Sequence, residues 1–208
     1  MNQLGLKKTE LRVINFFENI IGKYIILRKV TSSDALDIYT WRCSISGQYM
    51  RQPEGYSEES QIAWINSRSS KEINYIILDK FTNKKVGTIG IYDINISDRI
   101  ANVGRLLLSD EFLETSNPYG LEALLLTYDY VFNELNFRKI TGDILADNKQ
   151  MYKFQIFLGM KQEGYLESHV LIQDKFHDLY IMSIFKEQFN TLYKSRLNFL
   201  LKSFKINE

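Results

Sequence analysis

The fold is decided by the stretch YGLEALLLTYDYVFNELNFRKITGDILADNKQMYKFQIFLGMKQEG (residues 119–164) and its continuation YLESHVLIQDKFHDLYIMSIFKEQF (165–189). Apolar residues recur every three or four positions at first and then give way to strand-like runs. The pattern predicts a helix over 120–136, a strand over 139–145, a helix ending at Gly159, and a hairpin of strands 162–173 and 176–186.

Both predicted helices begin in a way that suits an anionic ligand. Gly120 opens the first helix and Asn148 the second. The first N–H groups of a helix have no partner within the helix, and they carry the positive end of its dipole. Two such helix starts side by side predict a binding place for a long phosphorylated ligand.

The residues before this stretch supply the rest of one domain. They predict strands over 24–30, 74–78, 86–95 and 101–108, helices over 34–42 and 57–68, and a loop over 43–56. This order predicts an α/β (mixed α+β) fold, in which a mostly antiparallel sheet of about seven strands carries helices on both faces. In such sheets, ligands bind beyond the carboxyl ends of the parallel strands.

Composition favours an ordinary globular protein. The 208 residues are 45% hydrophobic and 25% charged, and the formal charge is only +1. Dispersed charge of this kind disfavours nucleic acid and an anionic membrane as partners. Cys43 and two histidines are too few for an internal disulfide or a structural zinc site. Since no apolar run approaches the roughly 18 residues of a membrane span, we expect a cytoplasmic, metal-free protein.

Two segments flank the predicted domain over residues 24–189. Residues 1–23 form an N-terminal extension that lacks the apolar run of a signal peptide. Residues 190–208 contain NTLYKSRLNFLLKSF, which suits an amphipathic helix. We expect that helix to pack either on the domain or on a second copy in a homodimer.

The order of elements, with the motifs that fill it, resembles the GNAT family of acyl-CoA-dependent N-acyltransferases. The motifs are YGLEALLLTYDYVFNELNFRKI (119–140), the spacing from Asn148 to Gly159, and EGYLESHVLIQDKFHDLYIMSIFKEQF (163–189). They are most similar to the branch that holds the ribosomal-protein N-terminal acetyltransferases and the nucleotide-linked amino-sugar N-acetyltransferases. The resemblance implies a GNAT fold over about residues 24–189, acetyl-CoA or another acyl-CoA as cofactor, and direct transfer in a ternary complex.

In this family the pyrophosphate of CoA binds the backbone of a QxxGxG or RxxGxG loop before the long helix. Aligned on Gly120, the corresponding residues are Thr115, Pro118 and Gly120, so only the last glycine is kept. Pro118 has no N–H. The donors that the resemblance implies are Asn117, Tyr119, Gly120 and Leu121. The alternative is that Gly120 only starts a helix.

The resemblance also implies that the strands over 101–108 and 139–145 part, so that the pantetheine arm of CoA pairs with exposed backbone. Leu107 and Leu108 are the candidates for the N–H that polarises the thioester carbonyl. Asn148 corresponds to a CoA contact, although its residue type also suits a plain helix cap.

A proton donor for the CoA thiolate is implied on the second helix. Many members have a tyrosine seven residues after the asparagine, where this chain has Gln155, a residue that we expect to contact the cofactor. Tyr152 shares a helical face with Asn148 and Gln155, so it is the predicted acid. The alternative is that Tyr152 is an ordinary half-buried tyrosine.

Residues 41–64 are similar to the amino-sugar branch. The predicted substrate-binding residues are Trp41, Arg42, Met50, Arg51, Tyr56 and Gln61. Rings that stack on a base and guanidinium groups that fork onto phosphate suit a nucleotide diphosphate. The alternative assigns Trp41 and Trp64 to the core and leaves both arginines in solvent.

No clear base for the acceptor amine stands out. The catalytic candidates beside Tyr152 are Asp143 and His177, with Glu54 and Asp178 as further carboxylates. His169 and Asp178 match the tail pattern of the family, and the alternative is that they only brace the final hairpin.

The predicted function is N-acylation, most simply acetylation, of a nucleotide-linked deoxy-amino sugar in surface-glycan biosynthesis. The alternatives are acetylation of a protein N-terminus and a non-catalytic acyl-CoA-binding module. Polyamine acetylation is less expected, because the loop over 42–56 lacks the carboxylate cluster that a polycation needs. The favoured function predicts an arginine-bearing pocket near this loop.

Overall fold

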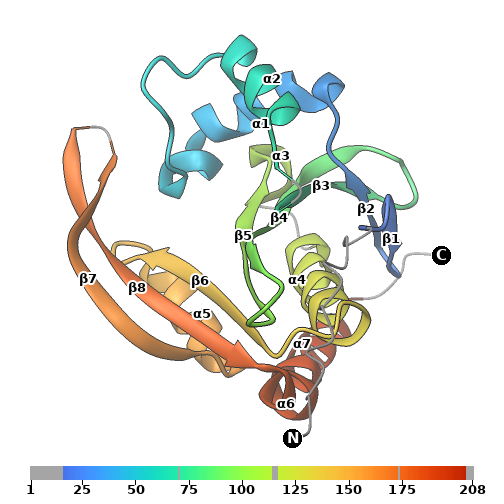
Figure 1. Ribbon diagram of the computed structural model, residues 1–208. Helices are drawn as coiled ribbons and strands as arrows, with labels where there is room; N and C mark the ends of the chain where they lie inside the picture. The colour runs from blue at the N-terminus through green and yellow to red at the C-terminus, as the bar shows by residue number, and fades with distance from the viewer. Residues whose placement is uncertain (1–15, 70, 114–116, 173, 205–208) are drawn as a thin grey trace, which may run out of the picture.

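The computed structural model describes residues 16–69, 71–113, 117–172 and 174–204. Eight strands form one open sheet in the order β1-β2-β3-β4-β5-β6-β8-β7 (Figure 1). All neighbours are antiparallel except β5 and β6, which are parallel. The strands are β1 (Asn19–Ile21), β2 (Ile25–Lys29), β3 (Ile73–Asp79), β4 (Lys85–Asn95), β5 (Ile100–Leu108), β6 (Lys139–Leu145), β7 (Lys161–Ile172) and β8 (Lys175–Phe185). The predicted mixed, mostly antiparallel sheet is confirmed.

The sheet has one strand more than predicted. β1 pairs with β2, and Asn19 stands opposite Arg28. A strand of three residues is too short to show the alternation by which strands are recognised in a sequence. The prediction placed it in the extension over 1–23, of which residues 1–15 lie outside the described part of the chain.

Helices connect the strands. The α-helices are α1 (Ala35–Cys43), α2 (Glu58–Asn66), α3 (Asp110–Leu113), α4 (Tyr119–Asp129), α5 (Lys149–Leu158), α6 (Lys186–Gln188) and α7 (Lys194–Leu201). Short 3-10 helices, η1 (Ser32–Asp34) and η2 (Ile45–Tyr49), flank α1, and π-helical turns, η3 (Tyr130–Glu134) and η4 (Phe189–Tyr193), follow α4 and α6. Gly159 ends α5 with a left-handed φ of 115°, as predicted. No helix in the described ranges is long and apolar enough to cross a membrane.

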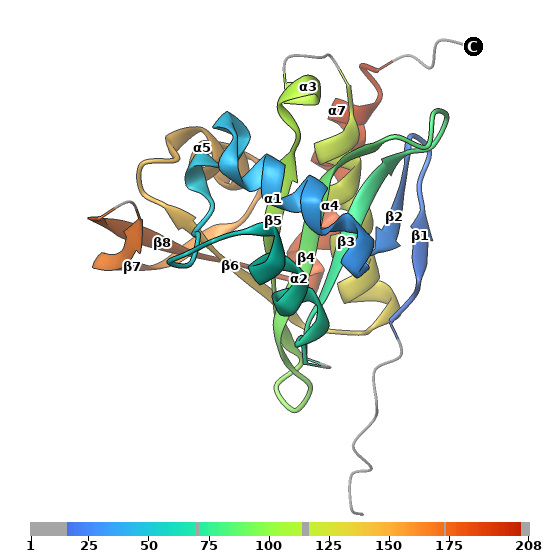
Figure 2. The same cartoon turned by 90° about the horizontal axis from the view of Figure 1, so that it is seen from above.

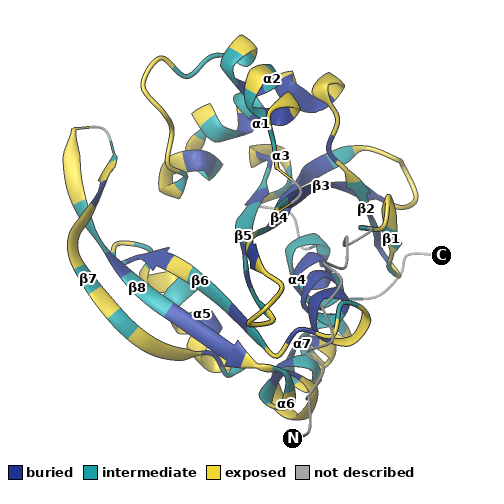
Figure 3. Ribbon diagram, viewed as in Figure 1, coloured by how far each residue is buried: buried dark blue, intermediate teal, exposed yellow. Residues whose placement is uncertain are grey.

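Side chains alternate between the two faces of the sheet, and each face carries helices. Tyr75 and Ile77 of β3 belong to a large core with residues of α4, α5 and α7, whereas Ile76 and Leu78 pack with α1 and α2. Figure 2 shows α1 and α2 on the opposite side of β3 and β4 from α4. All of β3 is buried, in contrast to most of β7 (Figure 3). The predicted helices on both faces are therefore confirmed.

A buried carboxylate ties α4 to the start of β2. Glu122 accepts hydrogen bonds from the backbone amides of Lys23 (2.7 Å), Tyr24 (2.7 Å) and Ile25 (2.9 Å). A Cβ on Gly22 would lie 2.8 Å from the Glu122 carboxyl carbon, so the chain can approach Glu122 only because residue 22 is glycine. This contact fixes the helix whose first turn faces the end of β5.

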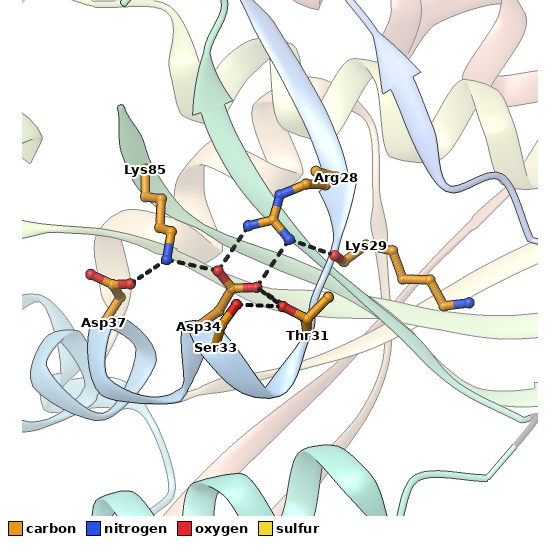
Figure 4. Close-up of polar contacts among 7 residues, drawn as sticks. All are labelled: Arg28, Lys29, Thr31, Ser33, Asp34, Asp37 and Lys85. Atoms are coloured by element: carbon orange, nitrogen blue, oxygen red, sulfur yellow. Dashed lines mark hydrogen bonds and ion pairs between the residues drawn. The ribbon is translucent and has the colours of Figure 1, made fainter. Parts of the chain in front are cut away.

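A second buried carboxylate joins α1 to the sheet (Figure 4). Asp34 is fully buried and pairs with Arg28 (2.8 Å) and Lys85 (2.8 Å). Burial alone raises the pKa of the Asp34 carboxyl, but the hydrogen bonds from Arg28 and Lys85 outweigh it and hold that pKa well below its usual range. The network anchors the segment that leads into the α1–α2 region.

The C-terminal segment packs on the domain. Phe189, Tyr193 and Leu197 are completely buried in the large core, and the ring of Tyr193 stacks on Tyr128 of α4 at 4.8 Å. We expected this segment to pack either on the domain or on a second copy, and its described residues pack on the domain. Residues 205–208 of the predicted helix lie outside the described part of the chain.

Candidate active site

The two central strands separate part-way along the sheet. β5 and β6 pair only through residues 100–102 and 139–141, beyond which they diverge (Figure 1). At the fork, a Cβ on Gly142 would lie 3.1 Å from the carbonyl oxygen of Val103, so glycine allows the strands to stay close up to the point of parting. Beyond the fork, one edge of β5 lacks a strand partner in the described ranges.

A bulge in β5 lies beside this free edge. Thr88 of β4 stands opposite Leu107, but Gly90 stands opposite Gly104, so two residues of β5 oppose one residue of β4. Arg105 lies in the bulge with a φ of +56°. Bulges redirect side chains, and here the guanidinium of Arg105 lies over the rings of Tyr92 (4.2 Å) and Trp64 (5.2 Å).

The predicted amide donors, Leu107 and Leu108, follow the bulge, and their backbone N–H and C=O groups point to opposite edges of β5. The carbonyl oxygen of Leu107 lies against Gly87 of β4, where it would clash with any Cβ. Ser109 donates its amide to Val86 of the same strand at 3.0 Å. Because backbone groups alternate along an antiparallel pair, Leu108 turns its N–H toward the edge that β6 leaves free. Leu108 is thus the better placed of the two.

A cavity of about 820 Å³ opens at the parted strands. It extends from the segment between α1 and α2, across β5 and β6, to α5 and the β7–β8 hairpin. Its inner wall is largely apolar and includes Leu124, Tyr128, Met151, Met160 and Met182. The end under α2 is polar and contains arginine side chains. The cavity therefore suits a long ligand that has an uncharged part and a charged part.

The polar end of the cavity has an excess of hydrogen-bond donors. The Nε of Arg42 and the Nε2 of Gln61 are buried and have no hydrogen-bond partner in the described part of the chain. Tyr56 donates its hydroxyl to Oε1 of Gln61 at 2.7 Å, which fixes the amide. Burial raises the pKa of Tyr56 to about 12, so this hydroxyl stays protonated, and burial lowers the pKa of Arg42. Unpartnered buried donors favour a ligand with oxygen acceptors.

Two aspartates lie on the same cavity wall as the bulge. Asp143 of β6 is exposed and accepts a hydrogen bond from the Tyr92 hydroxyl at 3.5 Å. Asp93, the residue after Tyr92, also lines the cavity. Burial, and then the charge of Asp143, raise the pKa of Tyr92. Tyr92 therefore stays a neutral donor, and the Asp143 carboxyl that it faces lies on the cavity wall, where an amino group could reach it.

The start of α4 lies beside the end of β5. Tyr119 donates its amide to the Asn117 side chain at 3.2 Å, and the first amide that donates within the helix is that of Glu122, to Pro118. The amides of Gly120 and Leu121 precede that first helical bond, as helix-start donors do. A Cβ on Gly120 would meet Leu108 at 3.6 Å, an ordinary contact, so crowding does not demand glycine here. Thr115 lies outside the described residues.

The Tyr119 side chain anchors the same turn. Its hydroxyl bonds to Asp79 at the end of β3. Burial raises the pKa of Asp79, but hydrogen bonds from Tyr119 and Thr82 outweigh it and lower that pKa. The first turn of α4 is thereby held rigidly to the sheet.

The start of α5 faces the cavity as well. Asn148 caps the helix by accepting the Met151 amide at 3.1 Å, and it lines the cavity, so the cap and a ligand contact are compatible. Gln155, two turns further on, is 6% exposed and also lines the cavity. Its Oε1 accepts the Tyr193 hydroxyl at 2.9 Å.

Comparison with known proteins assigns this architecture. Residues 25–161 match the model of the acetyltransferase (GNAT) domain family. The chain belongs to the GNAT acetyltransferase family. An uncharacterized N-acetyltransferase, p20, from Bacillus licheniformis is 24% identical over 186 residues, which cover 83% of this chain and 98% of that protein. The chain is thus a GNAT N-acetyltransferase, and members of this family use acyl-CoA, usually acetyl-CoA.

Solved structures show the same fold. A putative acetyltransferase from T. thermophilus superposes with a TM-score of 0.76 at 21% identity, covering 90% of this chain and 99% of that one. A spermidine N-acetyltransferase chimera from Vibrio cholerae and hSSAT superposes with a TM-score of 0.72 at 19% identity, covering 81% and 99%.

The GNAT cavity gathers part of the predicted site. The predicted residues that line it are Asp143, Asn148, Gln155, Arg42, Met50, Arg51, Tyr56 and Gln61. The predicted residues outside its described wall are Trp41, Leu107, Leu108, Asn117, Tyr119, Gly120, Leu121, Tyr152 and His177. Trp41 is buried in the core beneath α1, which matches the alternative that we gave for it.

Two catalytic candidates are engaged elsewhere. The Tyr152 hydroxyl bonds to Gln162 at 2.9 Å and its ring packs on Tyr180 at 4.3 Å. His177 pairs with Asp147 at 2.8 Å. Their catalytic roles stay predictions. Glu54, a further candidate, and His169, which matches the tail pattern, are exposed. Asp178 accepts hydrogen bonds from the Tyr165 hydroxyl and the Ser168 amide, contacts that brace the hairpin.

Two cavity residues, Tyr92 and Arg105, and one residue behind the cavity wall, Tyr193, were not predicted from the sequence. Arg105 and Tyr92 lie on strands whose alternation says nothing of a bulge. Tyr193 follows the predicted domain and appeared only as part of an amphipathic pattern. The one signal that could have found Arg105 is Gly104, which directly precedes it within the β-run, since glycine in a strand often marks a bulge.

The residues present fit an acyl-CoA. The free edge of β5 at Leu108 and the amides of Gly120 and Leu121 lie at one end of the parted strands, and the apolar inner cavity lies between those strands. The phosphates would be held by the helix-start amides, and the arm by backbone groups and the apolar wall. When bound, the cofactor supplies the activated acyl group as a thioester.

Proposed function

We propose that this GNAT enzyme transfers an acetyl group to the amino group of a nucleotide-linked deoxy-amino sugar, in one step within a ternary complex. The observation that carries the proposal is the pair of buried, unpartnered donors, Arg42 Nε and Gln61 Nε2, at the polar end of the cavity. A diphosphate supplies the acceptor oxygens that these donors lack.

Neighbouring side chains extend this donor set. Arg51 and the neutral Tyr56 line the same end, and the Trp64 ring, with the guanidinium groups of Arg68 and Arg105 over it, also belongs to this wall. The Arg42 guanidinium lies over the Tyr56 ring at 5.4 Å and donates to the Arg51 carbonyl, which holds its remaining edge in place. A preorganised arginine loses less entropy on binding phosphate than a free surface arginine does.

Asp143 is the group that we propose for the amine. Only it, among the three catalytic candidates, lines the cavity. The ammonium form of the acceptor would lose a proton toward Asp143, directly or through solvent, and the free amine would attack the thioester carbon. The carbon–sulfur bond then breaks, the attacking nitrogen gives up its extra proton, and the departing sulfur takes up a proton, so that an amide and free CoA thiol form. The free-edge N–H of Leu108 is the proposed donor to the oxyanion.

A polyamine acceptor is disfavoured by charge. Spermidine is the acceptor named for one structural neighbour, and a polycation needs several carboxylates along its length. The described cavity wall contains Asp93 and Asp143 but also Arg42 and Arg51, together with Arg105, which pairs with Glu72 at 2.8 Å. The arginines would repel a second ammonium group.

A panel of acceptors tests the proposal. Release of free CoA thiol is measured with nucleotide-linked amino sugars, the corresponding free amino sugars, spermidine and a peptide with a free N-terminus. We expect turnover of the nucleotide-linked sugars, with at least about 10-fold lower kcat/KM for the free sugars. Preference for spermidine or the peptide would overturn the acceptor assignment. Heat of acetyl-CoA binding without turnover of any amine would favour a non-catalytic module.

A further inference from the structure

The inner wall of the cavity contains one locked amide. Gln155 of α5 is 6% exposed, and its Oε1 accepts the hydroxyl of Tyr193 at 2.9 Å. Its Nε2 faces the sulfur of Met151 at 3.6 Å. A thioether sulfur can only accept a hydrogen bond, and only weakly. On this cavity-lining residue, the amide oxygen is therefore fixed by Tyr193, whereas the amide N–H groups have only a weak acceptor, Met151, which also lines the cavity.

The residue that locks the amide comes from outside the family domain. Tyr193 lies in η4, beyond residue 161, where the match to the family ends. It is completely buried, and its ring stacks on that of Tyr128, a residue of the cavity wall. Burial raises the pKa of Tyr193 well above the ordinary value, so its hydroxyl stays a donor at every accessible pH.

The surroundings of Gln155 indicate which part of a ligand it meets. The neighbouring wall, formed by Leu124, Tyr128, Met160 and Met182, is uncharged. Such a chamber is unfavourable for phosphate and suits the uncharged arm of acyl-CoA, whose amide and thioester oxygens accept hydrogen bonds.

We propose that Tyr193 is a positioning residue, which holds the Gln155 amide so that its N–H groups bind the pantetheine–thioester arm of acyl-CoA. The inference rests on the coenzyme part of the proposed function. It makes the C-terminal segment part of the active site: Tyr193 acts through Gln155 without touching the cofactor.

Calorimetry with acetyl-CoA tests the proposal through binding alone. We expect Tyr193→Phe and Gln155→Met each to weaken acetyl-CoA binding roughly 10-fold, the effect of one buried hydrogen bond. The double variant should bind no more weakly than Gln155→Met, because the two residues act as one unit. Adenosine 3′,5′-bisphosphate, which lacks the arm, should bind all four proteins equally.

Tyr24→Phe is the matched control. It also removes a tyrosine hydroxyl that holds the C-terminal segment, through a partly buried 2.9 Å bond to the Phe204 carbonyl, but Tyr24 lies outside the cavity wall. It should lower thermal stability by no more than Tyr193→Phe does and leave acetyl-CoA affinity unchanged. In kinetics, Tyr193→Phe should lower kcat/KM for acetyl-CoA and leave the KM of the acceptor unaltered.

Three results would overturn the inference: wild-type affinity in both single variants, additive losses in the double variant, or equal losses for acetyl-CoA and the bisphosphate. If Tyr193→Phe fails to fold, Gln155→Met with unchanged acetyl-CoA affinity overturns it equally. A folded wild-type protein that binds no acetyl-CoA would overturn the proposed function itself, and this inference with it.

Discussion

Arg42 and Gln61 carry the acceptor assignment at the level of single residues. Each has a buried N–H group without a partner in the described part of the chain, and Tyr56 orients one of them. A buried donor that is left unsatisfied costs about 1–3 kcal/mol. A bound acceptor oxygen would remove that cost, which is why the substrate is expected to be anionic at this end.

Replacing the arginine tests this directly. Arg42→Met keeps the aliphatic stem and removes the donors, so we expect the KM of a nucleotide-linked acceptor to rise between about 10- and 100-fold. The KM of acetyl-CoA, measured in the same steady-state assay, is the internal control and should change little. An acceptor KM that stays at the wild-type value would contradict the assignment.

Asp34 makes stability depend on pH. The pKa of its carboxyl is depressed in the folded protein, so its stabilising effect is complete above the unfolded value of about 3.9 and is lost as pH falls toward the folded value. At pH 7, Asp34→Asn should cost about 2 kcal/mol, less than a fully buried pair would, because Arg28 and Lys85 remain partly exposed.

Urea unfolding of both proteins at pH 7 and pH 3 checks this. Other carboxyls titrate in the same range, so the relevant quantity is the difference between wild type and Asp34→Asn. That difference should shrink on acidification. A difference that stays constant or grows would show that the ion pairs of Asp34 do not stabilise the fold.

Two glycines should respond oppositely to the same methyl group. Gly87→Ala places a Cβ against the Leu107 carbonyl and should cost about 2 kcal/mol or more. Gly120→Ala meets nothing closer than 3.6 Å and should be neutral or stabilise by about 0.5 kcal/mol, because alanine is the better helix former. Thermal unfolding of both variants measures the two effects. Strong destabilisation by Gly120→Ala would contradict the open space that the structure shows around Gly120 in the first turn of α4.

At the scale of elements, α4 is positioned by one side chain. Glu122→Ala would leave the amides of Lys23, Tyr24 and Ile25 without their acceptor, so we expect a loss of about 2–4 kcal/mol in denaturant unfolding. The exposed Glu167→Ala serves as control and should change stability by less than about 0.5 kcal/mol. Equal effects of the two variants would refute the anchoring role of Glu122.

Elements with long periodic patterns were predictable, and short or irregular ones were not. α4 and the strands β3 to β8 follow the apolar period of the sequence. β1 and α3, with three and four residues, carry too little pattern to be recognised. The bulge at Arg105 and the turn η2 depend on tertiary packing, which a local pattern does not encode.

The predicted site shows the same division. Arg42, Tyr56 and Gln61 line the cavity because the α1–α2 segment that contains them folds over the sheet as a unit. Tyr152 shares a helical face with Gln155, but its hydroxyl reaches Gln162 of the neighbouring strand instead of the cavity. Periodicity predicts on which face of a helix a residue lies. It does not predict which neighbouring residue the end of a long side chain contacts.

At the scale of the whole molecule, the parted strands organise everything else. The fork after residues 102 and 141 creates the cavity, α5 begins at its wall, and α4 contributes Leu124 and Tyr128 to it. The α1–α2 segment closes its polar end. The order of elements predicted the mixed sheet with helices on both faces, and the resemblance to the GNAT family implied the parted strands. The contribution of the C-terminal segment through Tyr193 could not be predicted, because a sequence does not show which surface an amphipathic helix covers.

Amide hydrogen exchange with and without CoA tests the central claim most directly, because it reports where the cofactor binds. The account predicts slower exchange in residues 103–108, the free edge of β5, and in the first turn of α4 at Gly120 and Leu121, with β7 unchanged. CoA binding that leaves both segments unprotected, or that protects a distant surface instead, would contradict the account.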